Sequence, residues 1–286
     1  MNQEMKDDAY SVLMSVYEKE KPEYLAQSVE SMLRQTLPPD DFVIVCDGPL
    51  GEELDKVIEG FDREHPGLFQ IVRLPKCGGL GNALNEGMRY CRFEKIARMD
   101  SDDISMEDRC RRQLAAMEEH QADIVGGTLY EFEGDISKIR TRRISPETPE
   151  EILRYARRRN PFNHPCVMYR RQAVEAAGGY RHCPWFEDYD LWSRMLLSGS
   201  RGYNVQEPVL YMRAGEAMYA RRGGFAYGRQ ALRFRWSLKK RGLSSWMDFL
   251  ISGGGQFVVS VMPNGLRKKF YGKVLRKEVP KNNGER

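Results

Sequence analysis

Four short apolar runs alternate with helix-like segments through the first hundred residues, and this alternation constrains the fold more than any other feature. The runs are YSVLMSVY (10–17), DFVIVCDG (41–48), FQIVRLP (69–75) and EKIARMD (94–100). Short apolar runs of this kind are typical of strands buried on both faces of a parallel sheet. The intervening segments have apolar residues at helical spacing. The resulting β-α-β-α-β-α-β order predicts an α/β fold with a Rossmann-like, mostly parallel central sheet and helices on both faces.

Acidic residues follow the last of these runs, where such sheets bind their ligands. Asp100 and Asp102 are two residues apart at the end of a strand, so their carboxylates are predicted to point to the same side. A divalent cation, Mn²⁺ or Mg²⁺, would satisfy both of them. The same acids also suit a helix start, with Asp102 or Asp103 capping ISMEDRCRRQLAAM. The local sequence leaves both interpretations open.

A second acidic centre lies in FEDYDLWSRMLL (186–197), where apolar residues at helical spacing predict a helix. Glu187, Asp188 and Asp190 then fall in its first turn. Acids at this position complement the helix dipole, so the pattern alone is explained without any catalytic role.

Seven segments together resemble the family 2 glycosyltransferases, which are inverting enzymes with the nucleotide-sugar-binding GT-A fold. In chain order they are SVLMSVY, SVESMLRQT, VIVCDGP, GGLGNALNEG, IARMDSDD, NHPCVMYRR and FEDYDLW, spanning roughly residues 10 to 195. The first glycines of GGLGNALNEG also suggest a dinucleotide-binding loop, but Leu84 stands where the third glycine is required. The resemblance instead implies a loop near the sugar-nucleotide donor.

The resemblance implies roles for individual residues on the donor side. Asp100 and Asp102 match the acidic DXD motif that holds the metal, with Asp100 also near the ribose. Asp47 matches the acid that recognises the nucleobase, and Cys77 stands where many relatives have asparagine. The residues assigned to nucleotide-sugar binding are Tyr17, Asp47, Gly79, Asn85, Asp100, Arg213, Arg221 and Arg222. For the glycines a tight turn, and for the arginines a solvated loop, remain the alternatives.

On the acceptor side the resemblance makes Asp188 the catalytic base and Glu187 the residue that orients the base or the acceptor. His164 and Trp185 are assigned to the acceptor site. The alternative for His164 is a hydrogen-bonded structural role, and the alternative for Trp185 is a place in the core. Trp192 is expected in the core.

The C-terminal part of the chain is strongly basic. Residues 201–286 contain 18 lysines and arginines against 5 acids, whereas the whole chain has a net charge of only +4. Its segments LRFRWSLKKRG and LRKKFYGKVLRK mix cations with aromatic residues and are predicted to form amphipathic helices at an anionic membrane. Nucleic acid is the competing partner, but no nucleic-acid module is recognised. We therefore divide the chain into a GT-A domain (1–222; nucleotide half 8–105, acceptor half 106–222) and a basic helical region (223–286).

The combined hypothesis is a metal-dependent, inverting glycosyltransferase of bacterial surface-polysaccharide biosynthesis. It would use a UDP-sugar donor and a saccharide acceptor, plausibly lipid-linked. The sequence predicts no secretory signal, no membrane span and six free cysteines, which suggests a cytoplasmic protein, peripheral on the inner face of the membrane. The alternatives are a nucleotidyltransferase and a non-catalytic binding protein on the same fold. The sugar, the linkage and the oligomeric state are left open.

Overall fold

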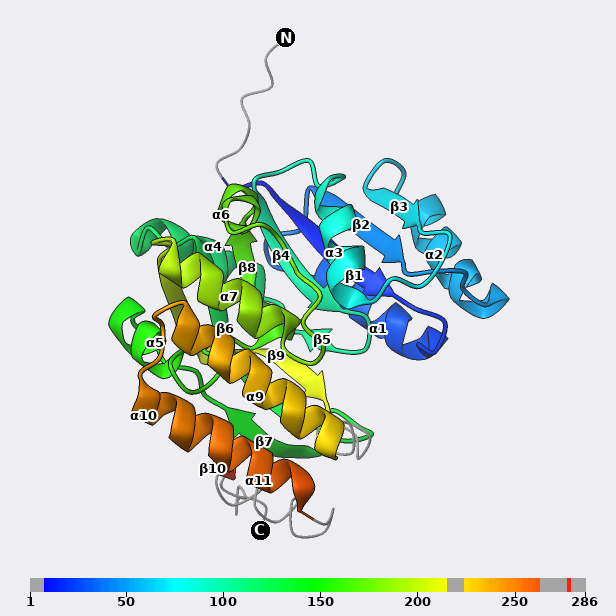
Figure 1. Cartoon of the computed structure of the whole chain (residues 1–286). Coiled ribbons are helices and arrows are strands. Elements are labelled where there is room, and N and C mark those ends of the chain that lie inside the picture. The colour runs from blue at the N-terminus through cyan, green and yellow to red at the C-terminus, as the bar shows by residue number, and fades with distance from the viewer. Residues whose placement is uncertain (1–7, 215–223, 263–276, 279–286) are drawn as a thin grey trace, which may run out of the picture.

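The computed structural model describes residues 8–214, 224–262 and 277–278. In this part of the chain ten strands form a single sheet, with helices on both of its faces (Figure 1). None of the helices in these ranges is long and apolar enough to cross a bilayer. All six cysteines are free thiols, as predicted.

The first half of the sheet is the parallel part that the sequence predicts. Its strands lie in the order β3-β2-β1-β4, and the pairs β1–β2, β1–β4 and β2–β3 are parallel. The elements are β1 (Tyr10–Val16), α1 (Pro22–Leu33), β2 (Asp41–Cys46), α2 (Glu52–Glu64), β3 (Phe69–Arg73), α3 (Leu80–Met88) and β4 (Lys95–Asp100). Because β2 and β4 lie on opposite sides of β1, the strand order reverses beside β1, where α/β sheets bind ligands.

The second half of the sheet is mixed. β8 is antiparallel to β4, and β6 is antiparallel to β7 and β8 but parallel to β9. The elements are β5 (Ile104–Ser105), α4 (Arg109–Glu119), β6 (Ile124–Phe132), β7 (Ile139–Arg143), α5 (Pro149–Tyr155), a 3₁₀ turn (His164–Cys166), β8 (Met168–Arg170), α6 (Arg171–Ala176), α7 (Glu187–Leu197), β9 (Gly202–Arg213) and β10 (Lys277–Glu278). β9 begins at Gly202, and its first residues pair with β6.

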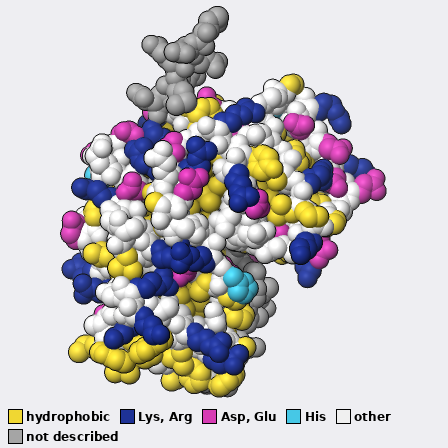
Figure 2. Space-filling view, turned by 45° about the horizontal axis from the view of Figure 1, so that its top comes forward, with side chains coloured by type: hydrophobic (Ala, Val, Ile, Leu, Met, Phe, Trp, Pro, Cys, Tyr) yellow, Lys and Arg dark blue, Asp and Glu magenta, His cyan; other side chains and the backbone are white. Residues whose placement is uncertain are grey.

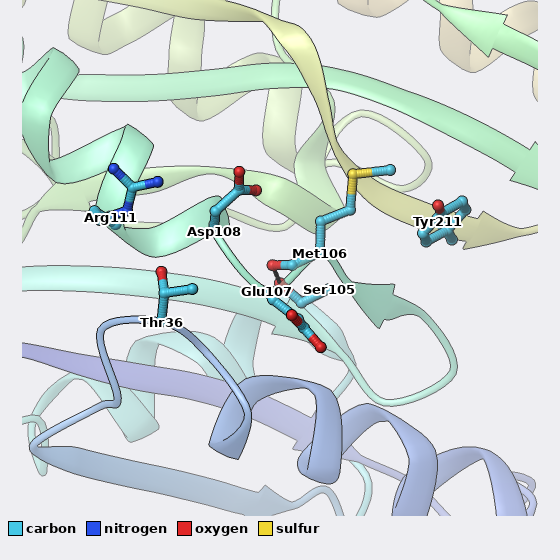
Figure 3. A pocket seen from close by; sticks show the side chains of 7 residues that line it. All are labelled: Thr36, Ser105, Met106, Glu107, Asp108, Arg111 and Tyr211. Carbon is cyan, nitrogen blue, oxygen red and sulfur yellow. Dashed lines mark hydrogen bonds between the residues drawn. The ribbon is translucent and has the colours of Figure 1, made fainter.

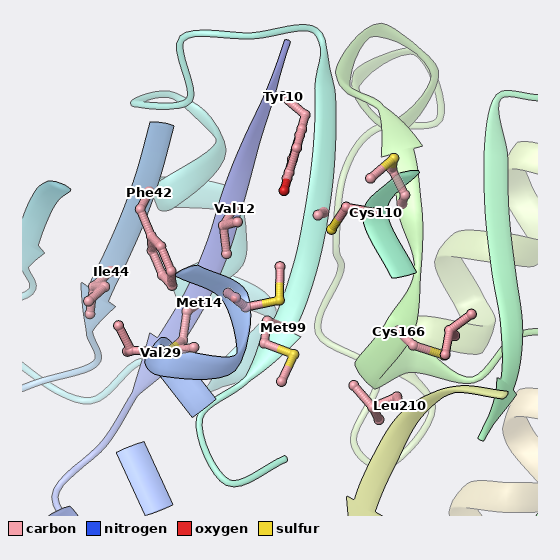
Figure 4. Packing of buried hydrophobic residues seen from close by; sticks show 14 of the residues in the cluster. Tyr10, Val12, Met14, Val29, Phe42, Ile44, Met99, Cys110, Cys166 and Leu210 are labelled. Carbon is pink, nitrogen blue, oxygen red and sulfur yellow. The ribbon is translucent and has the colours of Figure 1, made fainter. Parts of the chain in front are cut away.

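Alternate residues of β1 supply two hydrophobic cores, one on each face of the sheet. Tyr10, Val12 and Met14 pack with α1, α2 and α4 (Figure 4), whereas Leu13 packs on the other face with α3, α6 and α7. The near-continuous apolar runs of the sequence therefore correspond to strands covered on both sides.

Three further helices follow β9: α9 (Phe225–Lys240), α10 (Trp246–Phe249) and α11 (Gly255–Val261), with a π-helical turn at Leu250–Gly254 between the last two. α9 packs beside α7, and α10 and α11 pack on the other side of α9 (Figure 1). One side of α9 carries a stripe of buried apolar residues. It forms a third core with residues of α7 and its N-cap; the α9 residues are Tyr227, Ala231, Phe234 and Leu238. The second predicted basic segment, which contains Phe270 and Tyr271, lies outside the described residues.

Candidate active site

The carboxyl ends of neighbouring parallel strands bring together three residues that are far apart in the sequence. Tyr17 follows β1, Asp47 follows β2, and Asp100 ends β4. β1 lies between the other two strands, and Ser15 of β1 pairs with Asp100. The structure thus places these predicted donor-side residues at one edge of the sheet.

The acidic motif forms a compact cluster of three carboxylates. Asp100, Asp102 and Asp103 each have an oxygen within 4.8 Å of the others, so one cation could contact all three. The helix-capping alternative is wrong, because α4 begins only at Arg109 and residues 104–105 form β5 instead. Asp103, which the sequence suggested only as a cap, is the buried member of the cluster.

Burial and mutual repulsion raise the pKa of two carboxyl groups in this cluster. Burial, followed by repulsion from Asp100 and Glu20, raises the pKa of Asp102 to about 7. Burial and the two neighbouring acids also raise the pKa of Asp103 well above its usual value. In the described part of the chain Asp103 Oδ2 is buried without a hydrogen-bond partner. A divalent cation bound by oxygen ligands would relieve each of these costs, so the residues present fit such an ion.

Arg98 is the nearest internal counter-charge to the cluster. It precedes Asp100 by two residues in β4, so both side chains lie on the same face of the strand. Its Nη2 donates a hydrogen bond to Asp100 Oδ1, and its side chain is only 1% exposed. Sequence reasoning missed this residue, although an arginine inside a buried strand is an unusual signal.

Arg213 holds the turn that carries the acids. Its backbone N–H donates to Asp103 Oδ1 at 2.8 Å and its Nε donates to the carbonyl of Asp102 at 2.9 Å. Its guanidinium stacks on Tyr24, with 3.7 Å from Cζ to the ring centroid. The predicted phosphate contact of Arg213 stays a prediction, and Arg221 and Arg222 lie outside the described residues.

The carboxylate of Asp47 binds the loop that precedes α3. Its two oxygens accept hydrogen bonds from the backbone N–H groups of Gly78 (2.7 Å) and Gly79 (3.0 Å). Gly79 has φ of +86°, a conformation that side chains other than glycine rarely adopt. The tight-turn interpretation therefore holds for Gly79, and nucleobase recognition by Asp47 stays a prediction.

Asn85 joins α3 to the turn before α7. Its Nδ2 donates to the carbonyl of Tyr180 and its Oδ1 accepts from the Tyr180 N–H, both at 2.8 Å. Because both polar atoms of the amide bind the backbone, Asn85 holds α3, and with it the loop before α3 (the donor loop of the sequence prediction), beside the segment that leads into α7. Its direct contact with a donor stays a prediction.

The second acidic centre lies in the first turn of α7, as predicted. Asp188 Oδ2 accepts a hydrogen bond of 2.6 Å from Asn160, a residue that no sequence pattern singled out. Glu187 lies against the start of α3, since a Cβ at Gly81 would be 3.8 Å from its Cγ. Burial raises the pKa of Glu187. Asp190, by contrast, is bound to Arg194 and Arg241 and is structural.

Tyr180 lies beside both the start of α3 and the second acidic centre. Its hydroxyl lies 3.0 Å from His164 Nε2. A Cβ at Gly81, in the first turn of α3, would lie 3.2 Å from Tyr180 Cβ and 3.8 Å from Glu187 Cγ. The first turn of α7 therefore lies close to the loop that Asp47 binds.

The two aromatic residues predicted near the acceptor differ in environment. Trp192 is fully buried in the core, as expected. Trp185 is 48% exposed and has φ of +67°, which costs a bulky residue roughly 1–2 kcal/mol. It lies directly before the N-cap of α7. An exposed indole in a strained backbone beside Asp188 is suited to stacking on a sugar ring, and this role stays a prediction.

A separate cavity of about 550 Å³ opens between α1, β5, α4 and β9 (Figure 3). It is lined by Thr36, Ser105, Met106, Glu107, Asp108, Arg111 and Tyr211. No predicted site residue lines it, so this cavity is not part of the candidate active site.

Comparison with known protein families agrees with this geometry. The family model described as glycosyl transferase family 2 matches residues 11–178. An uncharacterized glycosyltransferase of Haemophilus influenzae is 36% identical over 94% of this chain and 99% of its own length. The amylovoran biosynthesis glycosyltransferase AmsE of Erwinia amylovora is 40% identical over 85% of this chain and 91% of its own length. An Escherichia coli UDP-Gal:alpha-D-GlcNAc-diphosphoundecaprenol beta-1,3-galactosyltransferase is 32% identical over 96% of this chain and 99% of its own length.

Solved structures share the fold at lower identity. Residues 1–349 of S. aureus TarS, in complex with UDP-GlcNAc, superpose with a TM-score of 0.58, at 17% identity, over 78% of this chain and 66% of that TarS fragment. The mannosyltransferase PcManGT of Pyrobaculum calidifontis, in complex with GDP-Man and Mn²⁺, superposes with a TM-score of 0.60, at 14% identity, over 91% of this chain and 78% of its own. These likenesses establish the common architecture.

Proposed function

This chain belongs to glycosyl transferase family 2, and from that premise we propose that it transfers one sugar, with inversion, from a UDP-sugar to a saccharide hydroxyl group. The observation that carries the proposal is the closeness of the second acidic centre to the loop at the strand ends. Asp47 binds the backbone of Gly78 and Gly79 in that loop, and a Cβ at Gly81 would lie 3.8 Å from Glu187 Cγ.

The first centre is suited to the leaving group. Asp100 and Asp102 would hold a divalent cation, with Asp103 as a third carboxylate, and the bound ion would supply positive charge for the departing diphosphate. Arg213 fixes the turn that presents these acids, and Arg98 orients Asp100. The presence of Mn²⁺ in PcManGT supports this assignment.

The second centre is suited to the acceptor. A sugar hydroxyl is a weak nucleophile at neutral pH, and a carboxylate within hydrogen-bonding distance can remove its proton as the new bond forms. We assign this task to Asp188, which Asn160 orients through a hydrogen bond to Oδ2. Glu187 lies beside the donor loop and would help to orient the acceptor, and the exposed ring of Trp185 would stack on it.

The acceptor class follows from the relatives. One relative is named for amylovoran biosynthesis, and another transfers galactose to a sugar on diphosphoundecaprenol, which is a lipid. We propose a lipid-linked saccharide acceptor in bacterial surface-polysaccharide biosynthesis. The enzyme would then work at the inner face of the membrane, with the basic C-terminal region as its contact with anionic lipid.

The first test is the substitution Asp188→Asn. Loss of the base should lower kcat for sugar transfer by about 10²- to 10⁴-fold, because general base catalysis contributes that much. Binding of UDP, measured calorimetrically, should stay unchanged. The matched control is Asp62→Asn, an exposed acid of α2 that should leave both quantities unchanged. Transfer at the wild-type rate by Asp188→Asn would remove the base assignment, whereas an absence of transfer by the wild-type protein itself would favour a non-catalytic binding role.

The second test concerns the cation. UDP should raise the melting temperature only when Mn²⁺ or Mg²⁺ is present, and a chelator should abolish the shift, because the diphosphate binds through the metal. Asp102→Asn should weaken the metal-dependent shift, whereas Asp62→Asn should retain it. An equal shift with and without the chelator would contradict the metal site.

A further inference from the structure

In the part of the chain that the structure describes, the helices after β9 expose an apolar face. Its large side chains lie on one side of the α10–α11 segment, and each is more than half exposed: Trp246, Met247, Leu250, Ile251 and Val258. The one charged residue between 246 and 258 is Asp248, which is buried and paired with Arg158. A continuous exposed face without any charge is unusual for a helix in water and indicates an interaction surface.

A basic stripe runs beside this apolar face. Arg229, Arg233, Trp236 and Lys240 are exposed on α9, and their spacing of three and four residues places them on one side of the helix. The ring of Trp236 is 5.4 Å from that of Trp246, so stripe and face adjoin. In Figure 2 hydrophobic side chains gather along the lower edge of the molecule, with lysines and arginines next to them.

We propose that this surface, the α9 stripe together with the exposed α10–α11 face, inserts into the headgroup region of an anionic lipid bilayer. The apolar side chains enter the acyl boundary and the cations contact lipid phosphates. Tryptophan is typical of this interface because its ring is apolar and its N–H is polar. Lys239 Nζ lies 4.2 Å from the ring centroid of Trp246, which places a cation beside the inserted aromatic ring.

A second copy of this chain fits the surface less well. A two-fold contact brings the same patch against itself, so the arginines and lysine of one stripe would face those of the other. Asp248 is the only acid between residues 224 and 262, and it is already buried. Charge complementarity therefore favours an anionic surface over a self-contact.

The surface is joined directly to the candidate active site. Tyr227 at the start of α9 packs edge-to-face on Trp185, with ring centroids 5.6 Å apart, and Arg235 Nη1 donates to the hydroxyl of Tyr189 at 2.9 Å. Docking of this surface would hold Asp188 at a fixed position relative to the headgroups. This benefit rests on the proposed function, because it applies to a lipid-linked acceptor.

Flotation of the full-length protein with vesicles tests the inference. Vesicles of equal parts phosphatidylglycerol and phosphatidylcholine should bind the protein, and vesicles of phosphatidylcholine alone should bind it at least about tenfold more weakly. Leu250→Glu should lower the partition coefficient about tenfold or more, and so should the combined Arg229→Gln, Arg233→Gln and Lys240→Gln variant. The matched control is Tyr90→Glu, which adds one charge at an exposed site in the turn after α3. Its binding should equal that of the wild type.

Tryptophan quenching by brominated lipids provides a second measurement that does not depend on any variant. Quenching in anionic vesicles supports insertion. Its absence, or equal flotation of Leu250→Glu and the wild type, overturns the proposal. A wild-type dimer that Leu250→Glu converts to a monomer, without vesicle binding by either, would assign the surface to a second copy instead.

The same variants separate this inference from the proposed function. In a vesicle-free assay with a soluble saccharide acceptor, Leu250→Glu should transfer sugar at the wild-type rate. Normal transfer with unaltered flotation of Leu250→Glu would defeat only the membrane surface. If Leu250→Glu loses flotation but the wild type transfers no sugar to any acceptor tested, the membrane surface is retained and the proposed function is wrong.

Discussion

Several polar residues at the carboxyl edge of the sheet bind the backbone of neighbouring segments, in addition to the roles proposed for them in binding the donor. Asp47 closes the loop before α3, Asn85 binds the backbone of Tyr180, and Arg213 holds the acidic turn. Each is a residue that the sequence assigned to the donor. Buried polar groups need hydrogen-bond partners, so a residue near a site often positions its neighbours before it binds a ligand.

His164 leads to a prediction about pH. Burial lowers the pKa of His164 well below 6.5, and the charge of Arg98 acts in the same direction. As the pH falls through 6.5, His164 binds a proton in the unfolded chain but stays neutral in the folded chain. The contribution of His164 to stability is therefore complete above pH 6.5 and is lost below it, at about 1.4 kcal/mol per pH unit.

Urea unfolding at pH 7.5, 6.5 and 5.5 measures this effect. The wild type should lose its stability advantage over His164→Gln as the pH falls, whereas the exposed-site control His182→Gln should follow the wild type. A difference between the wild type and His164→Gln that is the same at all three pH values would show that His164 titrates alike in both states.

At the scale of elements, close packing of α3 on the sheet brings the donor loop to the strand ends. Gly87 makes this possible, because a Cβ there would lie 2.5 Å from side-chain atoms of Leu13 and Val45. The sequence placed Gly87 in a loop near the donor. The structure places it inside α3, against β1 and β2.

Alanine substitutions of one glycine in α3 and one in α2 should therefore change stability in opposite directions. Gly87→Ala should destabilise the protein by about 1–3 kcal/mol, because overpacking outweighs the gain in helix propensity. Gly60→Ala should stabilise it by about 0.5–1 kcal/mol, since nothing lies within 4 Å of a Cβ in that part of α2. Chemical denaturation measures both. Stabilisation by Gly87→Ala would mean that α3 does not pack this closely.

At the scale of the whole molecule, α9 covers the start of the helix that carries Asp188. Phe234 is buried and stacks on Phe186, with ring centroids 4.7 Å apart. The division of the chain at residues 222 and 223 stays a prediction, and this contact makes it testable. If α9 and α7 unfold as one cooperative unit, the helices after residue 223 belong to the same domain as Asp188.

Phe234→Ala is the variant that decides this. It should lower the free energy of unfolding by about 3–5 kcal/mol, because a buried aromatic ring is removed. Hydrogen exchange should accelerate in α9 and in the first turn of α7 alike. Phe225→Ala, at an exposed position of the same helix, is the control and should have a much smaller effect. Faster exchange confined to α9 and the helices after it would support two separate units.

The sequence by itself determined the α/β class, the four parallel strands, and the positions of Asp47, Asp100 and Asp188 at element ends. These properties depend on apolar spacing over a few residues, which any local window of the chain contains. It also determined the core position of Trp192.

Only the tertiary structure decided which polar side chains of the candidate site are hydrogen-bonded to other residues of the protein. The pairing of Arg98 with Asp100, the hydrogen bond from Asn160 to Asp188, and the inclusion of Asp103 in the acid cluster could not be predicted from local patterns. Among the described residues, it also decided that the large apolar side chains of the α10–α11 face are exposed. Such features depend on how elements distant in sequence pack together, because a hydrogen-bond partner or a covering side chain comes from anywhere in the chain.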